Sequence, residues 1–259
     1  MTATVTLLTP PASPAETNAR PAAACGPTWT VVASPSLGTI ENYLYAVTGI
    51  SATDAWAVGM YSSTGLQQTL IEHWDGTEWT NVPSPNASGH NVLYGVAALS
   101  TDDVWAVGTH RPDLGTFKTL AMHWNGVEWS IVKSPNAAGD SFLYAAAAAG
   151  KQVWAIGQSS DAEPFRTLAM RWTGSRWKIV PTPNPYVGSH YLLGAAAVPS
   201  GSPRAWAAGN AANTPLILEW NGREWTSATA PGTDQFDPGR TQPDARRAPE
   251  SAPCRMTGA

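Results

Sequence analysis

Basic residues, cysteines and long apolar runs are all scarce in this 259-residue chain. Its 15 Lys and Arg against 19 Asp and Glu give a formal net charge of −4. The basic residues are scattered singly, so the positive surface that a phosphate backbone requires is missing. No apolar run approaches the roughly 20 residues that cross a bilayer, and the stretch 142–149 is far too short. We therefore expect neither a nucleic-acid partner nor a membrane span.

The two cysteines, Cys25 and Cys254, lie near opposite ends of the chain. They form neither a CxxC pair nor a metal-ligand spacing with the five histidines, so we predict no metal site and no cofactor. A disulfide between them is left open. Residues 1–27 have a short apolar patch and an Ala-x-Ala-like end but no basic start, and are either a disordered leader or the remnant of a signal peptide.

Tryptophan, glycine and proline are abundant instead, at 13, 23 and 22 residues, while charged residues make up only 13%. This composition is typical of many short strands joined by tight turns rather than of long helices. The 43% of apolar residues is enough for a sizeable core.

The tryptophans follow an internal repeat. The motifs DAWAVG, DVWAVG, QVWAIG and RAWAAG place Trp56, Trp105, Trp154 and Trp206 at intervals of 49, 49 and 52 residues. A second motif with two more tryptophans follows each of them: HWDGTEW, HWNGVEW, RWTGSRW or EWNGREW. With the solitary Trp29, every tryptophan falls on the repeat, so the repeat organises the fold.

Each repeat is predicted to form four short strands, which in the second repeat are NVLYGVAAL, DVWAVG, TLAMHW and VEWSIV. The last two strands are separated by Asp-Gly, Asn-Gly or, in the third repeat, Thr-Gly. We interpret this as a two-residue hairpin turn with positive φ at both central residues. That turn gives the hairpin one apolar face, where neighbouring sheets would pack. In the second repeat this face holds Leu120, Met122, Trp124, Val127, Trp129 and Ile131. The tryptophans are therefore predicted to be core residues rather than ligand contacts.

The first strand of each repeat is rich in small residues, as suits the crowded inner strand of a propeller. The tract 145–149 is all alanine and would favour a helix on propensity alone. Its counterparts YAVTGIS and YGVAALS favour a strand, and we give the repeat precedence over local propensity.

The pattern DVWAVG…HWNGxxW, with Ser-Pro-Asn at 84–86 and 134–136, resembles that of uncharacterised bacterial repeat proteins similar to the kelch and galactose-oxidase central-domain propellers. The resemblance covers about residues 28–230 and implies an all-β, β-propeller-like array of four-stranded antiparallel blades. The kelch double glycine and the sialidase-type Asp box are absent, and the Trp-Asp dipeptide of WD40 repeats occurs only at Trp74. The activities of those families therefore do not carry over.

We divide the chain into the leader 1–27, a repeat domain 28–230 and a tail 231–259 that lacks the repeat and is predicted to be disordered. The predicted blades are 43–83, 92–132, 142–180 and 191–228, with an extra strand at 28–34. Because one fourth-type strand is surplus, either four blades close into a small propeller or the array is an arc of a larger one, and an open edge would favour oligomerisation. The tail is typical either of a natural cap or of a truncated or frame-shifted reading frame.

The variable connections after the second and fourth strands lie on one rim of such a fold, which makes that rim the candidate binding surface. Two rows of polar residues are predicted at the mouth of the central channel: Glu41, His90, Asp140 and Ser189, and beside them Asn42, Asn91, Ser141 and His190. These side chains either bind a sugar or cation, or cap strands and satisfy backbone groups.

His73 and His123 form a third candidate, because each is predicted to lie across the hairpin from a glutamate, Glu78 or Glu128, and would titrate near neutral pH. The third and fourth repeats carry like charges at these positions, which favours exposed outer-edge residues instead. No nucleophile, base and orienting acid recur at a spacing that indicates a triad.

We therefore predict a non-catalytic scaffold, extracellular or in the cell envelope, that binds protein or glycan on its variable rim. A soluble cytoplasmic location is the alternative. The alternative function is a glycan-active hydrolase or lyase that uses the mouth carboxyls Glu41 and Asp140, so whether the protein is an enzyme stays open. A truncated chain without independent function is a third interpretation.

Overall fold

The computed structural model describes residues 30–113, 115–160, 164–198 and 204–228. The chain divides into two compact units, residues 1–31 with 241–259 and residues 32–240, and the strands of the described residues lie in the second. The predicted leader 1–27 and tail 231–259 lie outside the described residues.

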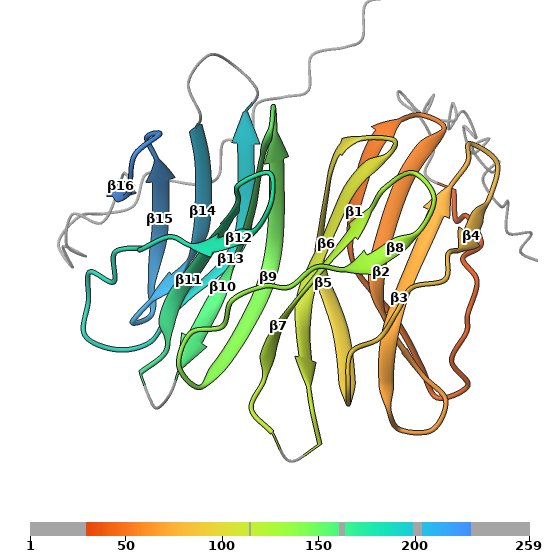
Figure 1. Cartoon of the computed structure of the whole chain (residues 1–259), viewed down its shortest axis with the longest axis horizontal. Helices are drawn as coiled ribbons and strands as arrows, with labels where there is room; N and C mark the ends of the chain where they lie inside the picture. The colour runs from red at the N-terminus through yellow and green to blue at the C-terminus, as the bar shows by residue number, and fades with distance from the viewer. Residues whose placement is uncertain (1–29, 114, 161–163, 199–203, 229–259) are drawn as a thin grey trace, which may run out of the picture. The chain divides into compact units, whose positions relative to one another are not determined.

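The described residues contain sixteen strands and no helix (Figure 1). The strands form four antiparallel sheets, each made of four consecutive strands, so the fold is the predicted all-β, β-propeller-like array of blades. Blade 1 contains β1 (Glu41–Ser51), β2 (Asp54–Ser62), β3 (Gln67–Trp74) and β4 (Trp79–Asn81); blade 2 contains β5 (His90–Ser100), β6 (Asp103–Arg111), β7 (Lys118–Trp124) and β8 (Trp129–Ile131). Blade 3 contains β9 (Asp140–Ala149), β10 (Gln152–Ser160), β11 (Arg166–Trp172) and β12 (Trp177–Ile179); blade 4 contains β13 (His190–Val198), β14 (Arg204–Ala211), β15 (Thr214–Trp220) and β16 (Trp225–Ala228).

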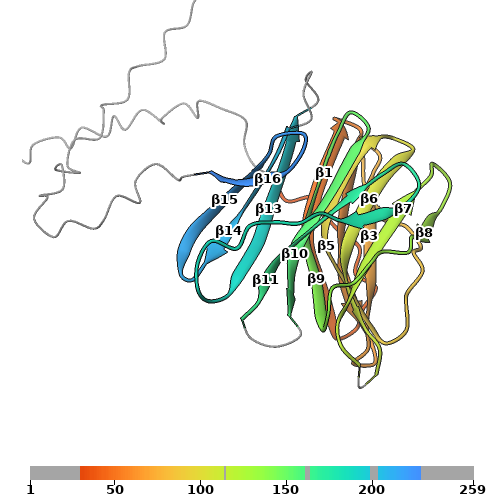
Figure 2. The same cartoon turned by 60° about the vertical axis from the view of Figure 1, so that its left-hand side comes forward.

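The first strands of the blades are the inner ones. β1 contacts β5, β5 contacts β9 and β9 contacts β13, so the blades follow one another in chain order (Figure 2). The alanine tract 145–149 lies in β9, which confirms the strand prediction. Alanines of β5, β9 and β13 line a hollow of about 220 Å³ between the inner strands, among them Ala97, Ala147 and Ala196. Small side chains let these strands approach closely.

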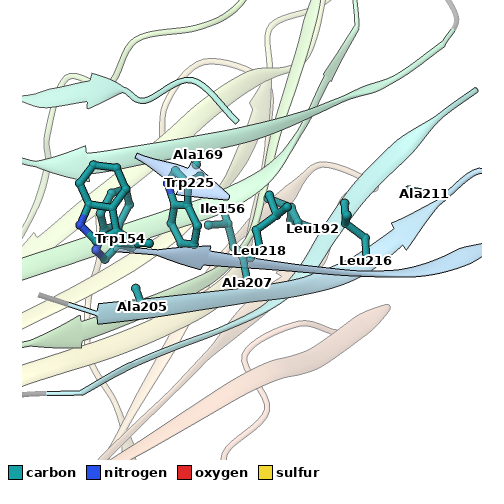
Figure 3. Close-up of a cluster of buried hydrophobic side chains, with 11 residues drawn as sticks. Trp154, Ile156, Ala169, Leu192, Ala205, Ala207, Ala211, Leu216, Leu218 and Trp225 are labelled. Atoms are coloured by element: carbon teal, nitrogen blue, oxygen red, sulfur yellow. The ribbon is translucent and has the colours of Figure 1, made fainter. Parts of the chain in front are cut away.

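Each blade has two apolar faces because side chains alternate along a strand. We call the face toward the preceding blade the leading face and the face toward the following blade the trailing face. In blade 2 the leading face includes Leu93, Val96, Ala106, Met122 and Trp129, which pack with Trp56, Val58 and Ile71 of blade 1. The trailing face of blade 2 contains Trp105, Val107 and Ala121, which pack with blade 3. The third joint, between blades 3 and 4, repeats this pattern (Figure 3).

The motif tryptophans form the same trio at each joint. The ring of Trp56 lies 4.9 Å from that of Trp124 and 5.4 Å from that of Trp129 in the next blade. The corresponding centroid distances are 4.6 and 5.2 Å around Trp105, and 4.8 and 4.9 Å around Trp154. The central ring is at most 2% exposed in each trio, so the prediction that these tryptophans are core residues is confirmed.

The glycine of the WAVG motif is required by a close approach to the first strand. A Cβ at Gly108 would lie 1.9 Å from the carbonyl oxygen of Val92, and the same contact would be 1.8–2.0 Å at Gly59, Gly157 and Gly209. The pairing of the first two strands shifts register beside this point in each blade. The motif therefore marks a β-bulge that only glycine accommodates.

The hairpin between the last two strands was predicted with the wrong turn. Trp124 pairs with Trp129, so four residues form the loop instead of two. Only Gly126 has positive φ, at 91°, because the Asn125 side-chain oxygen accepts the backbone N–H groups of Val127 and Glu128 at 2.9 Å each. Val127 is 81% exposed rather than on the apolar face. The tryptophans keep their face because a register shift of two residues preserves the alternation.

Residues 32–38 lead into β1 without pairing to any described strand. The described part of the predicted extra strand 28–34 is therefore not a strand. The fourth strand of each blade corresponds to this segment in the repeat. It pairs with the third strand of the same blade, as Trp79 of β4 pairs with Trp74 of β3. The described residues before β1 contain no such third strand.

Candidate functional site

The second predicted row caps the loops that lead into the first strands. The side-chain oxygen of Asn91 accepts the backbone N–H of Ala87 at 2.9 Å, and its amide donates to the carbonyls of Ala87 and Gly89. Asn42 makes the same pair of bonds with Gly38. Ser141 accepts from the N–H of Ala137 at 3.2 Å. These bonds show that the row shapes the rim loops, and whether it also meets a ligand stays a prediction.

His190 performs this capping in blade 4 as a neutral imidazole. Its Nδ1 lies 2.9 Å from the Gly188 carbonyl oxygen and its Nε2 lies 3.3 Å from the Tyr186 backbone nitrogen. Both contacts are satisfied when Nδ1 carries the proton and Nε2 accepts from Tyr186. Burial of the side chain lowers the pKa of His190, an effect that the Gly188 carbonyl opposes. The residue is fully buried.

The first predicted row links neighbouring blades at the rim. His90 Nδ1 accepts the backbone N–H of Gln67 at 3.4 Å, and Asp140 accepts that of Phe117 at 2.8 Å. Ser189 accepts that of Phe165 at 3.1 Å. In every case the donor belongs to the preceding blade, so these polar side chains connect consecutive blades. Glu41 holds the same position in blade 1, before which the described residues contain no blade.

A hollow of about 380 Å³ opens on this rim between the start of β5 and the loop after β6. It is lined by His90, Arg111, Pro112 and Asp113. Arg111 and Asp113 are exposed, and the Arg111 guanidinium lies 5.1 Å from the centroid of the Phe117 ring. Arg111 Nε donates to the Gly115 carbonyl at 3.2 Å, which fixes the loop. The hollow thus combines a cation, a carboxylate, an imidazole and a nearby aromatic ring.

Sequence analysis found His90 but missed Arg111 and Asp113. Both lie in THRPDLGTFK, a connection that varies in length and residue type between the repeats, so its charged residues do not recur at fixed positions. The signal available was the charge of that loop, which places Arg and Asp two residues apart on the predicted binding rim.

His73 and His123 do not pair with glutamates. His73 lies opposite Thr80, while its Nε2 is 2.9 Å from Asp54 Oδ1 and its ring is 4.4 Å from that of Trp56. His123 contacts Asp103 and Trp105 in the same way. The four-residue loop moves Glu78 and Glu128 out of register, so the predicted His–Glu contact is wrong.

The third and fourth blades show what this position does. Arg171 of blade 3 lies 5.9 Å from the Trp154 ring and 5.5 Å from the Trp220 ring. Glu219 of blade 4 accepts a hydrogen bond from Arg204. Histidine and arginine therefore cover the joint tryptophans, which is a packing role.

Two chemical features are absent from the part of the chain that the structure describes. No three His, Cys, Asp or Glu side chains gather there in an arrangement that could hold a metal ion. None of its segments forms a helix long and apolar enough to span a membrane.

No family model and no curated protein matches this chain. Solved structures that match part of this chain include a lectin from Aleuria aurantia in complex with Fucα1-6GlcNAc, at 13% identity and a TM-score of 0.47, over 68% of this chain and 56% of the lectin chain. Another is YCF48 bound to a D1 peptide, at 13% identity and a TM-score of 0.34, over 74% of this chain and 67% of that one. A third is fructan 1-exohydrolase IIa from Cichorium intybus in complex with 1-kestose, at 8% identity and a TM-score of 0.43, over 71% and 43%. The chain thus spans little more than half the length of the lectin.

Proposed function

We propose that this protein is a non-catalytic β-propeller scaffold that binds a glycan or protein ligand on the rim bearing the hollow around His90, Arg111 and Asp113. The hollow carries the proposal because it concentrates exposed polar groups on an otherwise tightly hydrogen-bonded rim. A guanidinium offers several donors in a fixed plane, a carboxylate offers acceptors, and an imidazole offers either. Such a set suits the adjacent hydroxyl groups of a sugar.

The described rim residues around the hollow are held by hydrogen bonds, which lowers the cost of ordering them on binding. Asn91 holds the loop before β5 and Asp140 ties the loop before β7 to the next blade. Arg111 is held by Gly115 and lies over the edge of the hollow. The ligand-contacting groups therefore sit on a framework that need not be ordered when the ligand binds.

The same proposal places the chain among the bacterial repeat propellers with DVWAVG…HWNGxxW motifs that are similar to kelch and galactose-oxidase propellers, and places it outside the cytoplasm. Neutral or acidic envelope glycans are ligands that fit a hollow with one exposed cation.

The test is a glycan array, with capture from cell-envelope extracts beside it, using the full chain and the double variant Arg111→Ala/Asp113→Ala. We expect the variant to lose at least about tenfold in affinity, because charge-assisted hydrogen bonds contribute about 1.5–3 kcal/mol each. Lys151→Ala is the matched control, since Lys151 is exposed in the turn between β9 and β10. Capture that is unchanged in the double variant would rule this hollow out.

The rows at the channel mouth need their own arm of the test. The triple variant Glu41→Ala/His90→Ala/Asp140→Ala probes the first row against the same ligands. Release of reducing ends from a captured glycan, lost in Asp140→Asn, would instead support the hydrolase or lyase alternative.

A further inference from the structure

The leading face of blade 1 is open, although the same face is sealed in every other blade. Leu44 is 42% exposed, whereas its counterparts Leu93, Leu143 and Leu192 are fully buried. Val47 is 67% exposed, against 7% for its counterpart Val96. An apolar patch of this kind marks a surface that is covered by something else.

A hollow of about 360 Å³ lies on this open face. Val47, Ala57, Glu72 and Trp79 are among its lining residues. In blade 2 the counterparts of these four residues pack with Trp56, Val58 and Ile71 of the preceding blade: Val96, Ala106, Met122 and Trp129. The hollow therefore has the position and lining that elsewhere receive a trailing face.

The trailing face of blade 4 is open in the complementary way. Ala208 is exposed at the position where Val58, Val107 and Ile156 are fully buried. Trp206 and Ile217 are only half-buried, whereas the trailing-face tryptophan of each internal joint is at most 2% exposed. The trailing face of blade 4, the last described blade, thus has the character of the faces that pack on a leading face at the internal joints.

The tryptophans that form a trio at each internal joint are found separately on the two open faces, two on blade 1 and one on blade 4. Each internal joint combines one tryptophan of a trailing face with two of the next leading face. Blade 1 has the pair Trp74 and Trp79, with ring centroids 5.7 Å apart. The trailing face of blade 4 has one tryptophan, Trp206, and no aromatic ring of the described residues packs on it. The two ends of one chain therefore hold the separate parts of one more joint.

We propose that a second copy of this chain covers these faces, with the trailing face of blade 4 of one copy packing on the leading face of blade 1 of the other. The argument for this occupant is that the chain itself carries both halves of a joint that it already makes three times. A head-to-tail contact of this type forms a ring when its rotation closes. Two copies of four blades give eight, which lies within the range of closed propellers.

Glu72 is a polar residue on the open leading face, beside its paired residue Asn81, at a position where blades 2 and 3 have Met122 and Met170. Both of its carboxylate oxygens accept from the Ser34 hydroxyl, at 2.9 and 3.0 Å. The hydroxyl comes from the segment before β1, so the carboxylate does not depend on the partner for a hydrogen bond. The apolar residues around it remain available to the second copy.

The test is the mass of the full chain in dilute buffer, measured by sedimentation velocity at micromolar concentrations. We expect twice the chain mass of 27.3 kDa. Val47→Arg, on the leading face, and Ala208→Arg, on the trailing face, should each return the mass to one chain. Both positions are exposed, so the fold tolerates the change, and unchanged far-ultraviolet circular dichroism verifies this. Val127→Arg, in an exposed hairpin loop away from both faces, should leave the dimer intact.

A mixture of the two variants distinguishes the geometry. One joint in the mixed dimer has both arginines and the other has neither, so mixing should restore the dimer mass. A wild-type mass of one chain overturns the proposal, and so does a dimer that persists in both variants. A dimer lost in only one of them means that like faces pair, which also overturns it. None of these readouts involves the rim hollow, so they are independent of ligand binding.

Discussion

The leading faces of blades 1 and 2 have similar sequences but different surroundings. Leu44 and Leu93 occupy the same position in their strands, yet one is 42% exposed and the other fully buried. The strand pairing within the two blades is nearly the same, with a register shift at this leucine in both. The difference comes only from whether another blade lies against the face. The residues of one repeat are thus enough to form its strands, whereas the buried core forms where two repeats pack against each other.

Glu72 and Met122 show how the sequence responds to that difference. Met122 is fully buried at a joint between two blades. Glu72 is buried as well, which raises its pKa, and the Ser34 hydrogen bond acts in the opposite direction. A buried carboxyl group is tolerated here because a hydroxyl from outside the blade donates a hydrogen bond to it.

The largest expected effect separates a joint tryptophan from its counterpart at the open end. Trp105→Ala removes a ring packed against His123, Trp172 and Trp177, and should lower the free energy of unfolding by about 3–5 kcal/mol. Trp206→Ala should cost no more than about 2 kcal/mol in dilute protein, since less apolar area leaves the interior. Urea unfolding of both variants measures this. Equal losses would mean that the trailing face of blade 4 is covered like the trailing faces at the internal joints.

A glycine comparison should give the next largest effect. A Cβ at Gly95 would lie 2.8 Å from the backbone of Ala145 in the next blade, whereas a Cβ at the counterpart Gly194 meets nothing within 4 Å. In the monomeric Val47→Arg background, Gly95→Ala should therefore destabilise by about 1–3 kcal/mol, and Gly194→Ala should be neutral or slightly stabilising. Thermal unfolding of the pair in that background checks this. A cost at Gly194 as large as at Gly95 would show that the trailing face of blade 4 is covered within a single chain.

The smallest effect concerns His190, which caps the loop before the first strand of blade 4. Blade 1 has Asn42 at this position. The pKa of His190 is lowered on folding. As the pH falls below the ordinary value of about 6.5, the unfolded chain takes up a proton that the folded chain does not, so stability decreases. His190→Asn keeps a capping side chain without this titration. The stability difference between wild type and variant should therefore shift in favour of the variant from pH 7.5 to pH 5. A constant difference over that range would contradict the neutral, buried His190.

Much of the fold could be predicted from the repeat. Its period fixed the number of strands per blade, and its consistency overruled the helical propensity of residues 145–149. The turn was predicted wrongly because Asn-Gly signals a two-residue turn only when both residues adopt positive φ. Here the Asn125 side chain replaces part of that turn by bonding to Val127 and Glu128. That choice depends on local hydrogen bonds which a dipeptide signature does not reveal.

The candidate site was less predictable. His90 was found because it aligns with polar residues of the other repeats, and Arg111 and Asp113 were missed because they lie in a connection whose length and residues vary between the repeats. The contact between His123 and Asp103 joins the third strand of blade 2 to the first residue of its second strand. These two residues are not directly opposite each other, because His123 pairs with Trp105. A shift of two residues in the neighbouring hairpin was enough to replace the expected glutamate.

The sequence by itself determined the blades, because each rests on short-range alternation, turn residues and a glycine at a fixed bulge. Only the tertiary structure decided which apolar faces are sealed and which are open, since burial depends on what packs against a sheet and not on its own pattern. The same is true of the rim: His90, Arg111 and Asp113 meet because β5 and the loop after β6 converge there.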